Sequence, residues 1–121
     1  MSYVRINTGV CLNSRFLRMS PEAQSMYLAM ILLADGNGMC DSFVVQQLTG
    51  RAEQDLNELV GNGFVIRIPD EQTVAIAHWL LHDPAALRRK QTTAYKSALR
   101  SLKTSNGVYS LKGREENEKE Q

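Results

Sequence analysis

The stretch AEQDLNELVGNGFVIRIPDEQTVAIAHW, residues 52–79, decides the fold, because the spacing of its apolar residues changes from helical to strand-like. Its first part predicts a helix over about residues 52–60, with Leu56 and Leu59 facing inward. The GNG triplet at 61–63 supplies left-handed backbone positions, which end a helix. A different element must therefore follow.

The second part of the stretch predicts a β-hairpin. Two runs of apolar and β-branched residues, 64–68 and 73–79, flank the polar turn PDEQ at 69–72. Alternate residues of the first run share one face of a strand, and Arg67 points to the other side, toward solvent or a ligand.

Two more helices are predicted upstream. The SPE motif at 20–22 begins the first one, because Ser suits the N-cap, Pro the first helical position and Glu the positive end of the helix dipole. This helix is expected to continue to about Ala34, where the DGNG turn at 35–38 breaks it. A second, short helix is predicted from Asp41 or Ser42 to Gly50. Two helices joined by about three residues suggest a helix-turn-helix.

A last helix is predicted after the hairpin. Asp83 and Pro84 open it, and it is expected to continue to about Lys103. Its second half is amphipathic, with Tyr95, Ala98, Leu99 and Leu102 on the apolar side. A basic stripe at i, i+4 and i+7 lies on another side and consists of Lys96, Arg100 and Lys103. The polar residues beyond Thr104 predict a frayed tail.

The order of these elements predicts the fold class. Three helices followed by a hairpin are typical of a winged helix-turn-helix. We therefore expect a mainly α protein with a small antiparallel β-hairpin and an additional C-terminal helix. The expected parts are a winged-helix domain at 1–83, a basic amphipathic helix at 84–104 packed on it, and a flexible, acidic-ended tail at 105–121.

Length and composition indicate one globular domain. The chain has 121 residues, of which 43% are hydrophobic and 22% charged, so a second independent core is not expected. It contains no apolar run long enough to cross a bilayer, and its first residues do not form a signal peptide. We expect a cytoplasmic protein without a membrane partner. Cys11 and Cys40 lack the spacing of a disulfide framework or a zinc knuckle, and both are interpreted as buried apolar residues.

Charge is segregated along the chain although the net charge is only +1. Residues 1–80 carry five Lys or Arg against eight Asp or Glu, whereas residues 81–114 carry eight basic residues and one acid, Asp83. Six of these basic residues follow one another without an intervening acid, and they are Arg88, Arg89, Lys90, Lys96, Arg100 and Lys103. They suit contact with a nucleic-acid backbone, and a solvated basic helix is the alternative.

The third helix is the usual reader of the DNA major groove in this arrangement. Here Arg51, Gln54 and Asn57 are the side chains expected to reach base edges. The same helix carries three carboxylates, Glu53, Asp55 and Glu58, which repel a phosphate backbone. An exposed acidic face or a protein contact is therefore an equal alternative. Arg67 is the only basic residue of the hairpin, whose turn carries two acids.

Catalytic, cofactor and metal sites are not expected. His78 and His82 have the four-residue spacing of helical metal ligands, but Trp79 is expected at a strand end, which argues for a packing role. The indole N–H of Trp79 then needs a hydrogen-bond partner. The sequence contains no phosphate-binding glycine motif and no activated nucleophile, so we do not expect an enzyme.

The chain resembles the N-terminal domain of phage replisome-organiser and DnaD-like DNA replication proteins over about residues 15–79. Four segments carry the resemblance, and they are RFLRMSPEAQSMYLAMILLAD (15–35), DGNGMCDS (35–42), LNELVGNGFVIRI (56–68) and VAIAHWLLHD (74–83). Asp83 stands where that family usually has Asn, and Ala52 stands where it has a helix-capping residue.

The resemblance implies a DNA-binding or scaffold module of a phage or prophage replication initiation protein. Its partners would be DNA, duplex or single-stranded, and a helicase or helicase loader. One alternative is a winged-helix protein-interaction or oligomerisation module, in which Tyr3, Val4 and Ile6 pair with another chain as a homo-oligomer. The other is a winged-helix transcriptional regulator, which would recognise two spaced half-sites.

Overall fold

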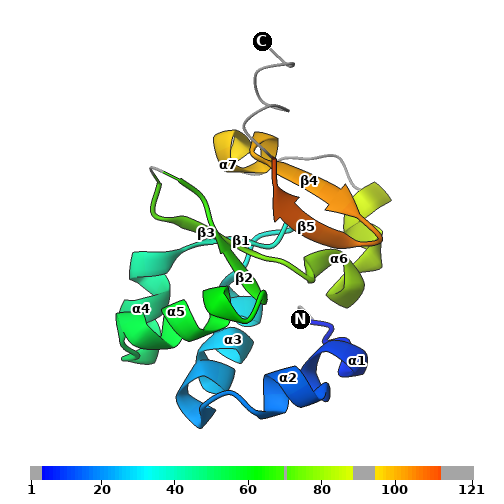
Figure 1. Ribbon diagram of the computed structural model, residues 1–121. Coiled ribbons are helices and arrows are strands. Elements are labelled where there is room, and N and C mark those ends of the chain that lie inside the picture. Colours follow the sequence, from blue (N-terminus) through cyan, green and yellow to red (C-terminus); the bar gives the residue numbers. More distant parts are fainter. Residues whose placement is uncertain (1–3, 70, 89–94, 113–121) are drawn as a thin grey trace.

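Helix α3 (Pro21–Leu33) is the longest helix of the computed structural model, which describes residues 4–69, 71–88 and 95–112 (Figure 1). Ser20 caps it, because its hydroxyl accepts a hydrogen bond from the Ala23 backbone N–H at 3.1 Å. One face of α3 is fully buried and consists of Ala23, Met26, Tyr27, Met30 and Ile31. The predicted start, end and core-facing side of this helix are confirmed.

Helix α4 (Ser42–Thr49) also follows the prediction. The Asp41 carboxylate accepts from the backbone N–H groups of Phe43 and Val44, which satisfies the open end of the helix. Gly50 ends it with a φ of 65°, a left-handed conformation that glycine adopts without strain.

Helix α5 (Glu53–Gly61) begins after Ala52, which has no side chain able to cap it. The Asp55 carboxylate reaches back instead and accepts from the Ala52 backbone N–H at 3.0 Å. Asp55 thus supplies one half of a capping box. The predicted helix forms without the usual capping residue.

Three short strands form an antiparallel sheet in the order β1-β3-β2. They are β1 (Met39–Asp41), β2 (Val65–Arg67) and β3 (Thr73–Ile76). The predicted hairpin is β2 and β3, with Val65 opposite Ile76. Strand β1 was not predicted, because three residues become a strand only through their pairing with β3, where Met39 faces Ala75.

The second strand ends earlier than predicted. It stops at Ile76, and Trp79 begins the short helix α6 (Trp79–His82). The Trp79 indole donates to the Gly36 carbonyl oxygen at 3.0 Å, so its predicted need for a partner is met. The expectation that Trp79 sits at a strand end is wrong.

Two further helices lie at the N-terminus, α1 (Thr8–Cys11) and α2 (Ser14–Leu17), and neither was predicted. Each is a single turn with an asparagine at its N-cap. The Asn7 side chain accepts from the Val10 N–H, and the Asn13 side chain accepts from the Arg15 N–H.

The C-terminal segment departs most from the prediction. A 3-10 helix η1 (Pro84–Arg88) and helix α7 (Lys96–Arg100) are followed by a hairpin of β4 (Leu102–Ser105) and β5 (Val108–Leu111). The single helix predicted over 84–104 is therefore wrong. Among its described residues only Lys96–Arg100 are α-helical, and Leu102 begins a strand. The flexible tail predicted over 105–121 is wrong for the residues of β5, and residues 113–121 lie outside the described part.

The turn of this hairpin explains the difference. Asn106 and Gly107 both have positive φ, 53° and 79°, which is the two-residue turn that matches the twist of an antiparallel pair. The hairpin is anchored by Tyr109, whose backbone N–H donates to the Ala77 carbonyl at 2.8 Å and whose hydroxyl donates to the Asn37 carbonyl at 3.1 Å. It is therefore packed against the rest of the chain (Figure 1).

An aromatic cluster lies at the centre of the core. The rings of Phe16, Tyr27 and Phe64 meet edge to face, with centroids 5.4 to 5.7 Å apart. Both cysteines are free thiols. Cys40 is buried as predicted, whereas Cys11, the last residue of α1, is only half-buried.

The described residues are about half helical, with small antiparallel sheets, which agrees with the predicted class. Among them, no helix has the length and apolar character that crossing a bilayer requires.

Candidate nucleic-acid interface

Two of the three carboxylates on α5 turn inward. Asp55 is 7% exposed and caps its own helix. Glu58 accepts from the backbone N–H of Ser20 at 2.8 Å and from its hydroxyl at 2.7 Å, so it holds the start of α3. The acidic face predicted for α5 is therefore wrong for these two residues, because their carboxylates accept hydrogen bonds at the first residues of α5 and α3.

The third carboxylate, Glu53, is exposed and neutralised. Its oxygens accept from the Gln46 side-chain amide at 2.6 Å and from the Arg67 guanidinium. The hydrogen bond from Gln46, followed by that from Arg67, lowers the pKa of the Glu53 carboxyl. Arg67 also donates to the Asn57 side-chain oxygen at 2.6 Å. The structure thus brings together two predicted site residues, Asn57 and Arg67.

The remaining candidates of this region point outward. Arg51 and Gln54 are both exposed, at and near the start of α5, and Asn57 follows one turn later. Residues three apart on a helix share one side, so Gln54 and Asn57 lie on the same side of α5. The exposed side of α5 is less acidic than its sequence indicates.

The C-terminal candidates do not form one helical stripe. Lys96 and Arg100 are exposed on α7, whereas Lys103 is exposed on strand β4. The stripe at i, i+4 and i+7 is therefore wrong for Lys103, because the chain leaves the helix at Ser101. Arg88 is the last residue of η1. Arg89 and Lys90 lie outside the described residues.

Helix α7 lies beside the β2–β3 hairpin. The Ser97 hydroxyl donates to the Glu71 carboxylate at 3.5 Å, and Glu71 belongs to the turn of that hairpin. This exposed contact joins α7 to the turn of the hairpin that carries Arg67. Sequence reasoning missed it, because it joins residues 26 positions apart.

The two histidines are positioned by helix α6. His82 is 2% exposed and uses both ring nitrogens: Nδ1 accepts from the Asn7 backbone N–H at 2.8 Å, and Nε2 lies 2.7 Å from the Tyr27 hydroxyl. Burial, and secondarily the nearby His78, lowers the pKa of His82 to about 4. His82 is therefore a neutral core residue with a hydrogen-bonded role. Within the described ranges, no three His, Cys, Asp or Glu residues are grouped as metal ligands would be.

Cys40 lies in the middle of β1, and its side chain is buried. Burial, and to a lesser extent the charges of Asp35 and Asp41, raises the pKa of Cys40 to about 12. The thiol stays protonated at neutral pH, and the thiolate is the nucleophilic form.

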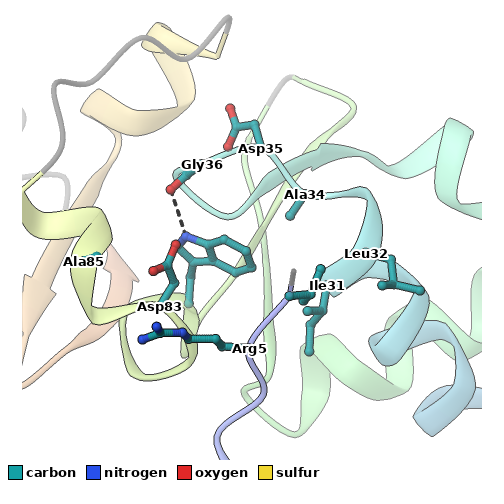
Figure 2. A pocket seen from close by; sticks show the side chains of 10 residues that line it. Arg5, Ile31, Leu32, Ala34, Asp35, Gly36, Asp83 and Ala85 are labelled. Carbon is teal, nitrogen blue, oxygen red and sulfur yellow. Dashed lines mark hydrogen bonds between the residues drawn. The ribbon is translucent and has the colours of Figure 1, made fainter. Parts of the chain in front are cut away.

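A cavity of about 580 Å³ lies between the N-terminal segment, α3 and α6 (Figure 2). Its lining combines apolar side chains such as Leu32 with the charged residues Arg5, Asp35 and Asp83. Trp79 and Gly36, which also line it, are joined by a hydrogen bond. The cavity is lined by one positive and two negative side chains, so its charge favours neither an anionic nor a cationic ligand.

Comparisons with known proteins give this chain no relatives. No protein-family model matches it, and neither a curated protein nor a solved structure does.

Proposed function

We propose that this chain is a winged-helix module that contacts DNA during the initiation of replication. The observation that carries the proposal is the element order α3-β1-α4-α5-β2-β3 with the strand order β1-β3-β2. In such a module α4 and α5 form the helix-turn-helix, and β2 and β3 form the wing. Helix α5 contacts β2 directly, as a reading helix contacts its wing (Figure 1).

The proposed contact surface consists of α5, the β2–β3 hairpin and α7, and we call it the basic surface. Its exposed or half-exposed cations are Arg51, Arg67, Lys96 and Arg100. Its exposed carboxylates in the described part are Glu53 and Glu71. Among the described residues the four cations outnumber the two carboxylates, since Asp55 and Glu58 turn inward. Asp70, the other acid of the hairpin turn, lies outside the described residues. Such a surface suits contacts to phosphates, which give affinity without reading the base sequence.

In the absence of DNA, the Arg67 guanidinium binds the side chains of Glu53 and Asn57. Each of these contacts is exposed to solvent, where an ion pair contributes little. A DNA phosphate can therefore replace Glu53 as the partner of Arg67. This exchange would release the Asn57 side chain for a base edge.

The replication role rests on the resemblance of residues 15–79 to replisome organisers. A module of that kind acts in the cytoplasm, at an origin or as a scaffold for a helicase or helicase loader. Nonspecific phosphate contacts suit a scaffold, because they hold the protein on DNA while the partner selects the site.

The proposal is tested by titrating fluorescent duplex and single-stranded DNA of equal length with the whole chain at several salt concentrations. We expect binding that weakens as salt increases. Arg51→Ala should weaken it, whereas Arg5→Ala, which removes an equal charge from the N-terminal segment, should change it less. Tight binding to one sequence with two spaced half-sites would instead indicate a transcriptional regulator.

A protein-interaction module is the second candidate, and exposed apolar side chains on α3 and α4 favour it. Leu32 is 70% exposed and Leu48 is 66% exposed, and α3 and α4 pack against each other. Leu28, Phe43 and Val44 are exposed on the same two helices. Exposed apolar groups of this size are typical of association surfaces. A change of mass with concentration in light scattering, abolished by Leu32→Lys, would support this function.

A further inference from the structure

We propose that the cavity between the N-terminal helices and α6 binds the phosphate group of a small phosphorylated molecule. This cavity has a volume of about 600 Å³ and is separate from the one in Figure 2. Its polar lining comes from Asn7, Asn13, Ser14, Arg15 and His78. The inference does not depend on the DNA contact proposed above.

The charge of the cavity favours an anion. Arg15 and His78 are its only lining residues that can carry a charge, and no carboxylate lines it. Within the described residues, the Arg15 guanidinium forms no ion pair. Arg15 is exposed and lines the cavity. A guanidinium in such a place is suited to a phosphate, which accepts two parallel hydrogen bonds from it.

His78 stands close to this arginine and has an unused nitrogen. Its Nδ1 is buried and has no hydrogen-bond partner among the described residues. The ring packs against Phe64, with centroids 5.4 Å apart. In our proposal the other ring nitrogen, Nε2, contacts the ligand. Burial, and secondarily the positive charge of Arg15, lowers the pKa of His78. The two side chains therefore interact electrostatically.

Two neutral donors complete the set. The Asn13 side-chain oxygen accepts from the Arg15 backbone N–H at 2.7 Å, so the amide nitrogen of Asn13 remains to donate. The hydroxyl of Ser14 is exposed beside it. Donors of four kinds surround the cavity, which a tetrahedral phosphate with three terminal oxygens can satisfy better than a planar carboxylate.

The size of the cavity indicates that the phosphate belongs to a larger molecule. Small-molecule sites have volumes of about 300 to 1,000 Å³. This cavity falls in that range, and a phosphate ion alone would leave most of it empty. Val10, Phe64 and Leu81 supply an apolar wall for the organic part of the ligand.

The whole chain, labelled with ¹⁵N, is titrated with glucose 6-phosphate, glucose, inorganic phosphate and acetate in separate arms, and the ring signals of His78 are followed. We expect a saturable shift with glucose 6-phosphate, a weaker one with inorganic phosphate and none with glucose. Acetate as effective as phosphate would overturn the choice of phosphate.

The variants place the site. Arg15→Ala should weaken glucose 6-phosphate binding at least tenfold, and Arg18→Ala, three residues along and outside the cavity, should leave it unchanged. Arg15→Lys, which keeps the charge but loses the two parallel donors, should give an intermediate affinity and serves if Arg15→Ala fails to fold. The absence of a saturable shift, or equal affinities for Arg15→Ala and Arg18→Ala, would overturn the proposal.

A duplex oligonucleotide with and without a 5′-phosphate separates this site from the basic surface. A gain in affinity that depends on both the 5′-phosphate and Arg15 would identify a DNA end as the source of the phosphate. If the 5′-phosphate has no effect while glucose 6-phosphate binds, the ligand is a small molecule. Salt-dependent duplex binding that Arg15→Ala leaves intact tests the DNA contact alone.

Discussion

The Tyr27 hydroxyl lies 2.7 Å from Nε2 of His82 in the buried core. Because Nδ1 of His82 accepts from the Asn7 backbone N–H, the ring proton belongs on Nε2, and Nε2 donates to the tyrosine oxygen. A protonated His82 would point a second N–H at the Asn7 N–H and lose that bond. The neutral imidazole therefore ties α3, α6 and the segment before α1 together.

Acid should destabilise the fold through His82. The pKa of His82 is about 4 in the folded chain and 6.5 in the unfolded one, so the unfolded chain binds more protons between these values. The free energy of unfolding should thus be constant above pH 6.5 for this group and fall as the pH decreases from 6.5 to 4. The loss is about 3 kcal/mol when complete. Urea denaturation at pH 7.5, 5.5 and 4.5 measures it.

His78 contributes to this pH dependence in the same direction, because its pKa is also lowered. The variants His82→Gln and His78→Gln, each denatured at the same pH values, separate the two. His82→Gln should remove most of the decrease in the free energy of unfolding at low pH. If it keeps the whole decrease, the assignment to His82 is wrong.

Tyr27→Phe should destabilise the chain by about 1 to 3 kcal/mol, because it leaves the buried N–H of His82 without an acceptor. The denaturation midpoint should fall while the slope stays constant. Tyr27 is fully buried, and phenylalanine fills nearly the same space, so packing contributes little. A midpoint equal to that of the unchanged chain would contradict the hydrogen bond.

Glu58→Ala should cost about 1 to 2 kcal/mol, because the carboxylate accepts two hydrogen bonds from Ser20 at the start of α3. Glu53→Ala on the same helix is the matched control. It removes an exposed ion pair and should change the stability by less than about 0.5 kcal/mol. Thermal unfolding of both variants measures the contrast, and equal effects would refute the inward role of Glu58.

Gly107→Ala should destabilise the β4–β5 hairpin. Its φ is 79°, and an added Cβ would lie 2.9 Å from Cδ2 of Leu81. We expect a loss of about 1 to 2 kcal/mol in thermal unfolding. Gly61→Ala, where no atom lies within 4 Å of the new carbon, should be close to neutral. A similar result for both glycines would contradict the packing of this hairpin.

The helices α3, α4 and α5 were predictable because their signals are local. Ser20 marks the start of α3, and Asp41 and Gly50 mark the two ends of α4, through bonds to residues a few positions away. The GNG triplet at 61–63 marks the end of α5. Strand β1 has no such signal, since it depends on pairing with a strand more than thirty residues later. The Asn106-Gly107 pair is a local hairpin signal, but the spacing of Leu99 and Leu102 suits a helix as well.

The candidate site was less predictable than the fold. The Glu58 carboxylate accepts a hydrogen bond from Ser20, which lies 38 residues earlier in the chain. This contact removes a negative charge from the exposed side of α5, and no sequence pattern indicates it. The same holds for the cavity proposed to bind a phosphate group, which residues 13–15 line together with His78. The sequence shows which residue types are present, whereas the contacts between them are visible only in the tertiary structure.

The central proposal is that the basic surface binds DNA, and the salt dependence of duplex affinity tests it most directly. With about four phosphate contacts, the logarithm of the binding constant should fall against the logarithm of salt concentration with a slope of about −4. The triple variant Arg51→Ala, Lys96→Ala, Arg100→Ala should reduce the magnitude of that slope by about 3. Binding that does not respond to salt, or a slope that the triple variant leaves unchanged, would contradict the proposal.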